Sequence, residues 1–140
     1  MTQSLELADE LGSLALFADL SHPKLESVAH SFEEAWFTKD ERILREGLTG
    51  TGFYVILEGE AAVRAGGRET AILGRGAFFG EVSVLLGEAP SADVVALRQM
   101  RCLHMAGPAL HEFLLAHPAV MYRMLLEQTR RLRTTTRARG

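Results

Sequence analysis

The sequence lacks the features that mark several large classes of protein. It has a single cysteine, Cys102, among 140 residues, which excludes an intramolecular disulfide and fits a reducing compartment. No apolar run approaches the length of about 18 residues that a membrane-spanning helix needs. The first residues also lack the basic start and apolar core of a signal peptide. We therefore expect a cytoplasmic protein that makes no contact with a membrane.

Strong charge and catalytic motifs are missing as well. The formal net charge is −3, which gives no overall attraction to nucleic acid or to an anionic membrane. The sequence has no nucleophile elbow, no P-loop lysine after a glycine run and no H-E-x-x-H or paired C-x-x-C motif. Cys102 and His104 are two residues apart, on the same side of an expected strand, but two such residues make a weak metal or haem site. The sequence predicts neither an enzyme nor an obligatory cofactor.

The composition is that of one folded domain with helices at both ends. A length of 140 residues with 47% hydrophobic residues suffices for one core, so we expect a single domain over residues 1–140. Apolar residues recur at helical spacing before residue 35, which predicts N-terminal helices within residues 1–34. The helical period returns over residues 108–133, with a short helix stopped near Pro118 and a long helix after it. Residues 134–140 form a basic tail.

The central segment, residues 35–106, has the character of short strands. Phe53, Val55 and Leu57 alternate with Tyr54, Ile56 and Glu58, as in a strand. Gly66-Gly67 is typical of a hairpin turn. Further strands are expected at Glu69–Leu73, Asp93–Ala96 and Met100–Met105. Many short strands with tight turns favour an antiparallel roll or barrel. The expected fold class is mainly β with flanking helices.

The most informative stretch is rich in glycine. Glycines 74, 76 and 80 allow positive φ angles and close backbone approach to a ligand. The apolar run Val82–Leu86 lies between Gly80 and Gly87, which predicts one or two helical turns whose first amides suit an anion. Glu81 stands beside those amides. It is either a helix cap or an acceptor for a sugar hydroxyl.

These residues resemble a known family. The run from Phe79 to Leu85, followed by Gly87-Glu88 and Ser91–Val94, is similar to the phosphate-binding cassette of the cyclic nucleotide-binding domain family. The likeness extends over about residues 14 to 133. It implies an antiparallel, jelly-roll-like β-roll with the cassette at residues 79–94, N-terminal helices and a long C-terminal helix.

The resemblance also implies a ligand, cAMP or cGMP, and the residues that bind it. Glu81 would accept the ribose 2′-hydroxyl, and backbone amides near Gly80 and Ser91 would contact the phosphate. Gln128 would reach the base, unless it is a polar interruption in a dimer seam. The expected ligand-binding residues are Phe79, Gly80, Glu81, Val82, Ser83, Pro90, Ser91, Ala92, Gln128 and Thr129.

The sequence departs from the family where an arginine normally pairs with the phosphate. Ungapped matching places Pro90 there, and proline offers neither a cation nor a backbone N–H. A charge-assisted bond to phosphate contributes about 1.5–3 kcal/mol. The carboxylates of Glu81, Glu88 and Asp93 add repulsion toward an anion. The candidate replacement cations are Arg75, Arg98 and Arg101, each of which also reads as a solvated surface arginine.

Two functional hypotheses follow. The first is a cyclic nucleotide sensor that signals through its C-terminal helix, by forming a homodimer or by contacting a partner protein. The second is a degenerate cyclic nucleotide-binding fold that acts as a dimerisation or interaction scaffold, or that binds a different small anion. The arginine-rich C-terminal end could touch nucleic acid by counterion release, but a chain without room for a helix-turn-helix is not expected to bind it.

Overall fold

The structure, a computed structural model, describes residues 2–48 and 52–139 of the chain. The chain divides into two compact units. The helical unit comprises Met1–His30 and Glu112–Gly140, and the β unit comprises Ser31–His111. The expectation of one domain over residues 1–140 stays a prediction.

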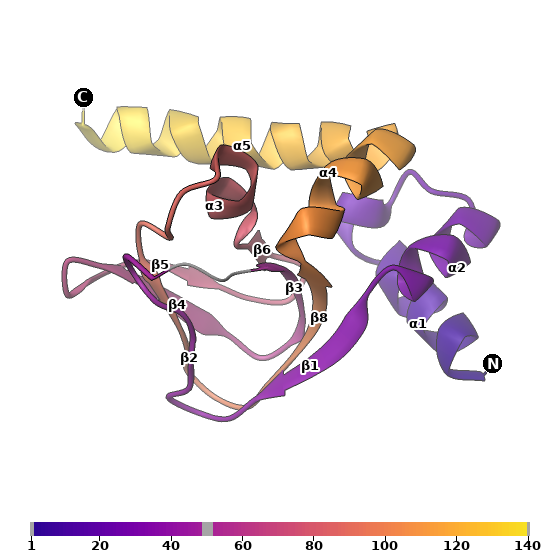
Figure 1. Ribbon diagram of the computed structural model, residues 1–140, viewed down its shortest axis with the longest axis horizontal. Coiled ribbons are helices and arrows are strands. Elements are labelled where there is room, and N and C mark those ends of the chain that lie inside the picture. Colours follow the sequence, from indigo (N-terminus) through magenta and orange to yellow (C-terminus); the bar gives the residue numbers. More distant parts are fainter. Residues whose placement is uncertain (1, 49–51, 140) are drawn as a thin grey trace. The chain divides into compact units, whose positions relative to one another are not determined.

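Within the described residues, the β unit contains eight strands in two four-stranded antiparallel sheets (Figure 1). Sheet A has the order β1-β8-β3-β6 and sheet B has the order β2-β7-β4-β5. The strands are β1 (Glu33–Phe37), β2 (Arg42–Leu44), β3 (Gly52–Glu58), β4 (Ala61–Ala65), β5 (Arg68–Leu73), β6 (Phe78–Phe79), β7 (Asp93–Ala96) and β8 (Met100–Ala106). This arrangement confirms the expected antiparallel β-roll.

The boundary between the N-terminal helices and the β-roll differs from the expectation. The last N-terminal helix ends at His30 and β1 begins at Glu33, so placing the helices up to residue 34 was wrong. Glu33 starts a strand because it pairs with His104 of β8, far along the chain. Strands β2 and β6 were not anticipated. They are three and two residues long, too short to show an alternating pattern.

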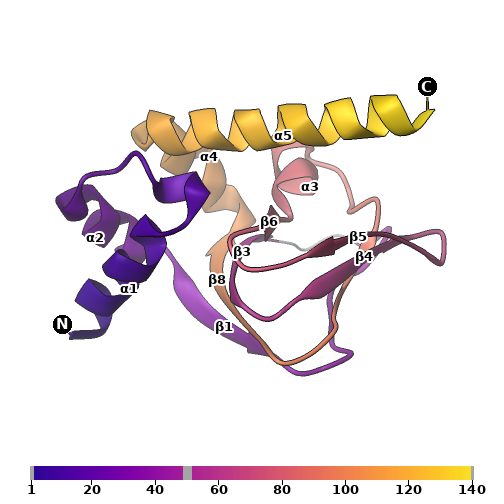
Figure 2. The same cartoon turned by 180° about the vertical axis from the view of Figure 1, so that it is seen from behind.

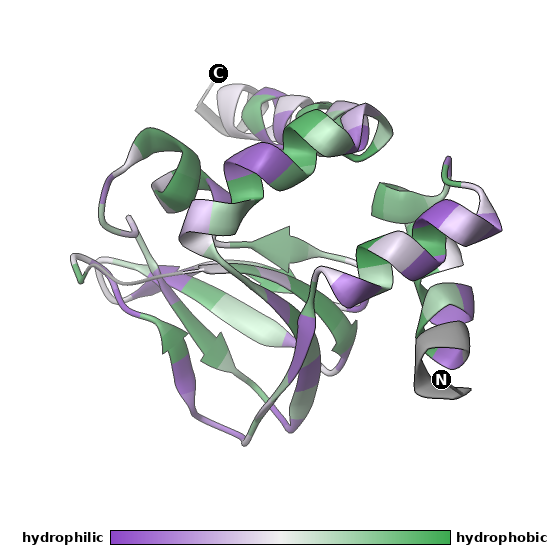
Figure 3. Ribbon diagram, turned by 45° about the vertical axis from the view of Figure 1, so that its right-hand side comes forward, coloured by the Kyte–Doolittle hydropathy of each residue, from purple (hydrophilic) through white to green (hydrophobic). Residues whose placement is uncertain are grey.

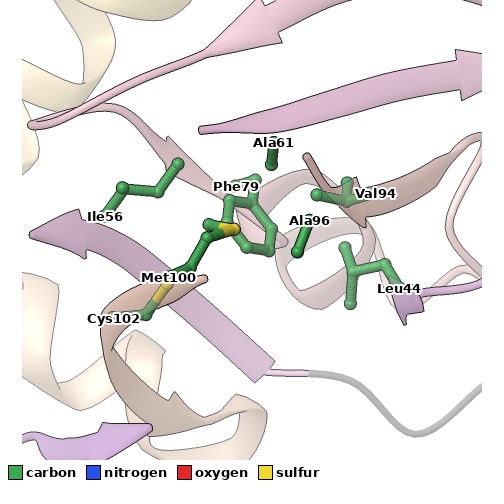
Figure 4. Packing of buried hydrophobic residues seen from close by; sticks show 8 residues of the cluster. All are labelled: Leu44, Ile56, Ala61, Phe79, Val94, Ala96, Met100 and Cys102. Atoms are coloured by element: carbon green, nitrogen blue, oxygen red, sulfur yellow. The ribbon is translucent and has the colours of Figure 1, made fainter. Parts of the chain in front are cut away.

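The core of the β unit lies between its two sheets. It consists of Leu44, Ile56, Ala61, Phe79, Val94, Ala96, Met100 and Cys102. Figure 4 shows Phe79 in the middle of this cluster, with residues of sheet A on one side and residues of sheet B on the other. The Tyr54 ring stacks on Phe79 at 5.0 Å between centroids. Phe79, the residue before Gly80 and the short helix that follows it, is therefore anchored in the core.

The helical unit contains α1 (Thr2–Gly12), the 3-10 helix η1 (Ala15–Phe17), α2 (His22–His30) and α5 (Pro118–Arg139). Helices α1 and α2 pack side by side (Figure 2). Helix α4 (Gly107–Ala116) carries the chain from the β unit into the helical unit. Arg123 of α5 donates to both carboxylate oxygens of Asp19, at 2.7 and 2.8 Å. These hydrogen bonds hold the pKa of Asp19 below its ordinary value.

Helix α5 is longer than the sequence predicted. Its expected end at residue 133, and the separate basic tail over residues 134–140, were wrong, because the helix continues to Arg139. Two threonine hydroxyls of this segment are satisfied within the helix. Thr134 and Thr135 each donate to the carbonyl four residues earlier, both at 3.0 Å, and no glycine or proline interrupts the segment before Gly140.

Among the described residues, no helix combines the length and the apolar character needed to cross a bilayer.

Candidate functional site

The cassette begins with a turn that only glycine fits. Gly80 follows β6 with φ 93° and ψ −16°, in the left-handed region. A Cβ atom added there would overlap the carbonyl oxygen of Gly52 on β3. Helix α3 (Glu81–Leu86) follows at once and ends at Gly87, which is also left-handed and donates to the carbonyls of Ser83 and Val84. This confirms the predicted short helix between the two glycines.

The loop before the cassette is fixed to β3 by backbone hydrogen bonds. Gly76 has φ 85° and donates to the Ile56 carbonyl at 2.8 Å, while the Ile56 N–H donates to Ala77 at 2.9 Å. Gly74 does not adopt a positive φ, so the conformational freedom of glycine is used at Gly76 and Gly80 but not at Gly74. The loop and the cassette therefore rest on the same strand of the roll.

Glu81 is the buried charged residue of the cassette. It is the first residue of α3 and is 2% exposed. Gly80 occupies the N-cap position without a side-chain hydrogen bond, so Glu81 is a first-turn residue and not the cap. A carboxylate is costly to bury unless its oxygens are hydrogen-bonded, and Glu81 does interact with other groups of the chain. The fold thus holds an acceptor group below the surface at the start of α3.

The other side chains of α3 are of two kinds, a buried serine that bonds locally and apolar groups that are exposed. Ser83 is 7% exposed and its hydroxyl donates to the Gly80 carbonyl at 3.2 Å. Val82, Leu85 and Leu86 are 50%, 51% and 64% exposed. In Figure 3, which colours each residue by its hydropathy, most of α3 has the hydrophobic colour. Helix α3 therefore presents an apolar surface on the β unit.

The second half of the cassette is attached to the segment that follows β2. Pro90 is buried, and its carbonyl accepts a hydrogen bond from the Gly47 N–H at 2.9 Å. One carboxylate oxygen of Asp93 accepts from the Glu46 N–H at 2.7 Å, and the other lies 3.6 Å from Arg42 Nε. The expected phosphate-contacting residues between them, Ser91 and Ala92, are exposed and half-buried. Positions 90 and 93 are thus fixed by backbone contacts.

The three candidate replacement cations have partners elsewhere in the β unit. Arg75 donates to the Leu57 carbonyl at 3.2 Å, and Arg98 lies 3.6 Å from a carboxylate oxygen of Glu60. Arg101 requires a correction, because its side chain is only 14% exposed and is not a solvated surface group. Its contacts are Glu58 at 3.3 Å, Glu34 at 3.5 Å and the Trp36 ring at 5.8 Å.

The remaining expected ligand residues lie on α5, in the helical unit. Thr129 is exposed and its hydroxyl donates to the Leu125 carbonyl at 2.8 Å. Gln128 is half-buried. Their contact with a base stays a prediction.

Cys102 and His104 are both packed against neighbouring side chains. Cys102 is fully buried, and burial raises the pKa of its thiol to about 12. The His104 ring packs against Tyr54 at 4.8 Å. Among the described residues, no group of three or more metal-ligating side chains is assembled.

Sequence reasoning missed Gly52, the residue whose carbonyl decides that position 80 must be glycine. Its only signal was a glycine directly before the apolar run that starts at Phe53. It also missed the pairing of Arg42 with Asp93, because the two residues are brought together by the contact between β2 and β7.

The β unit thus combines an antiparallel β-roll, a glycine-bounded helix between two of its strands and a buried glutamate at the start of that helix. The sequence pattern of the "Cyclic nucleotide-binding domain" family matches residues 34–117. The chain belongs to this family.

Individual relatives are consistent with this family assignment. A cAMP-dependent protein kinase regulatory subunit of Mycosarcoma maydis is 37% identical over 90 residues, which cover 61% of this chain and 17% of the relative. The crystal structure of the Thermus thermophilus catabolite activator protein has a TM-score of 0.78 at 26% identity, covering 87% of this chain and 60% of that one. The chain spans less than a fifth of the curated relatives that it matches.

A further solved structure shares the fold. It is the regulatory subunit of a cAMP-independent protein kinase A from Trypanosoma cruzi, bound to guanosine. The TM-score is 0.68 at 20% identity, and the match covers 79% of this chain and 40% of that chain.

Proposed function

We propose that this chain is a regulatory domain that binds a cyclic nucleotide of the cAMP type in the cassette from Phe79 to Val94. It then passes the signal on through α5. The observation that carries the proposal is the buried carboxylate of Glu81, 2% exposed, directly after a turn that admits only glycine. No catalytic role is proposed for the chain.

The proposed anchor of the ligand is its ribose. Glu81 stands where the family accepts the ribose 2′-hydroxyl, and a hydrogen bond to a charged acceptor contributes about 1.5–3 kcal/mol. The Trypanosoma cruzi subunit is bound to guanosine, a nucleoside that has a ribose and no phosphate. That ligand supports placing the ribose contact, and not the phosphate contact, at the centre of the proposal.

The test of ligand binding is a thermal melt with cAMP, cGMP and 2′-deoxy-cAMP. A ligand at about a hundred times its Kd adds about 2.7 kcal/mol to the free energy of unfolding, which raises the Tm of a domain of this size by roughly 10 °C. We expect this shift with cAMP or cGMP and a much smaller one with 2′-deoxy-cAMP, which lacks the hydroxyl that Glu81 would accept. Equal shifts with cAMP and its deoxy analogue would contradict the role of Glu81.

Signal output is proposed to run through α5. Met121, Leu125 and Leu132 are exposed by 39%, 61% and 68%, and with Gln128 they repeat at intervals of four, three and four residues. This is the spacing of a coiled-coil seam. We therefore propose that two copies pair along α5, with Gln128 as the polar position in the seam.

The dimer proposal predicts that Leu125→Arg shifts the chain toward a monomer, because it places two like charges in one seam. Sedimentation velocity over a range of protein concentrations measures the change. Leu115→Arg is the matched control, since Leu115 is similarly exposed at 62% but lies on α4, outside the seam. A wild-type chain that stays monomeric at every concentration, or a control that dissociates equally, would contradict the proposal.

An interaction scaffold is the second candidate function. It is favoured by Pro90 at the position of the phosphate arginine and by the apolar surface of α3, formed by Val82, Leu85 and Leu86. Exposed apolar patches mark protein interaction sites. This candidate predicts that no nucleotide or nucleoside changes the Tm.

A further inference from the structure

We propose that Pro90 makes this cassette selective for an uncharged ribonucleoside over a cyclic nucleotide. The inference rests on the proposed function, because it concerns the ligand of the same cassette. It names the chemical class of that ligand and the residue that sets the preference.

The first observation is what Pro90 presents to the cassette. Its ring carries no cation and its nitrogen has no hydrogen to donate. The residue is buried, and its carbonyl is engaged with the Gly47 N–H at 2.9 Å. A carbonyl oxygen would in any case repel an anion. Position 90 therefore contributes no attractive group to a phosphate.

The second observation is the charge of the cassette. Residues 79–94 contain three acids, Glu81, Glu88 and Asp93, and no lysine or arginine. Arg42 approaches Asp93 at 3.6 Å, which offsets one of the three negative charges. The other two belong to the buried Glu81 and the exposed Glu88. The field of the cassette opposes a negatively charged ligand and leaves an uncharged one unaffected.

The third observation concerns the arginines that could compensate. Arg75 is held by the Leu57 carbonyl at 3.2 Å, Arg98 lies beside Glu60 at 3.6 Å, and Arg101 lies between Glu58 and Glu34 under the Trp36 ring. Moving any of them to the cassette would give up these contacts. The ribose acceptor Glu81 is thus present in a cassette that offers a phosphate no cationic side chain of its own, and that combination fits a nucleoside.

The test is isothermal titration of the full chain with adenosine, guanosine, cAMP and cGMP. We expect at least one nucleoside to bind more tightly than its cyclic nucleotide. Added salt should strengthen the binding of the cyclic nucleotide, because it screens the repulsion, and should leave the nucleoside unchanged. A cyclic nucleotide that binds more tightly than its nucleoside would overturn the inference while the proposed function stands. If none of the four binds, both fail.

The variant Pro90→Arg tests the residue itself. A charge-assisted contact should raise the affinity for a cyclic nucleotide by roughly ten- to a hundredfold and leave nucleoside affinity unchanged. Pro90→Gln is the control, because it also restores the backbone N–H and adds a polar side chain, but without a charge. An equal gain with Pro90→Gln, or no gain with a folded Pro90→Arg, would overturn the assignment of selectivity to Pro90. Should either variant fail to fold, the wild-type titration still decides the ligand class.

Discussion

Gly80→Ala is expected to lower the free energy of unfolding by about 3 kcal/mol or more, and the Tm by roughly 10 °C. Two costs add at this position. The first is the left-handed backbone, φ 93°, which disfavours any residue with a Cβ. The second is the overlap of that Cβ with the Gly52 carbonyl, which belongs to strand β3 and has little room to move. Urea or thermal unfolding of the variant measures the loss.

Gly87→Ala is the matched control for Gly80→Ala. Gly87 is also left-handed, with φ 68°, but an added Cβ would meet nothing within 4 Å. Only the backbone cost applies, about 1–2 kcal/mol. The difference between the two variants therefore isolates the close approach of Gly80 to β3. Equal losses would show that the Gly52 carbonyl does not constrain position 80.

Glu81→Gln is expected to weaken ligand binding by roughly ten- to a hundredfold, since it removes the charged acceptor of about 1.5–3 kcal/mol. The substitution keeps almost the same volume. Its effect on stability should be small or favourable, because it takes a charge out of a buried position. Titration with an uncharged nucleoside is the decisive measurement, because relief of charge repulsion cannot then mask the lost hydrogen bond.

Glu88→Gln controls for the change of charge. Glu88 lies in the same cassette but is exposed, so its loss should leave nucleoside affinity almost unchanged. A loss of affinity with Glu88→Gln as large as that with Glu81→Gln would contradict the assignment of the ribose contact to Glu81. So would a folded Glu81→Gln variant that binds as tightly as the wild type.

Much of the fold could be predicted from local patterns. The strand β3, the Gly66-Gly67 turn and the short helix between Gly80 and Gly87 each depend on residues close in sequence, and all three are present. The burial along β3 does not alternate, however, because Val55, Ile56 and Leu57 are all fully buried. Strand β2 and the contact of Gly80 with Gly52 depend on residues distant in sequence. Such pairings leave no periodic signal in a single chain, so they could not be predicted.

The first half of the cassette, around Gly80, could be predicted from the sequence better than the second half, around Pro90. Gly80 and Glu81 were identified from the glycine spacing and the resemblance, and the structure shows why the first must be glycine and that the second is buried. The environment of Pro90 was not predictable. Its hydrogen bond with Gly47 and the pairing of Arg42 with Asp93 arise from packing between segments more than forty residues apart.

The end of α5 shows how composition misleads near a terminus. A run of arginines and threonines resembles a solvated tail, and threonine is a modest helix former. The threonine hydroxyls instead bond to carbonyls within the helix, which satisfies their polar groups where they stand. The helix continues for six residues beyond its expected end, from residue 134 to Arg139.

The proposed ribose contact places the sugar of a bound nucleoside or nucleotide on the side chain of Glu81. A crystal structure of the chain with its tightest ligand tests this contact most directly. We predict a ribose hydroxyl within hydrogen-bonding distance of the Glu81 carboxylate, about 2.5–3.0 Å between oxygens, with Pro90 making no contact to a charged group. A ligand bound elsewhere, or a ribose turned away from Glu81, would contradict the proposal.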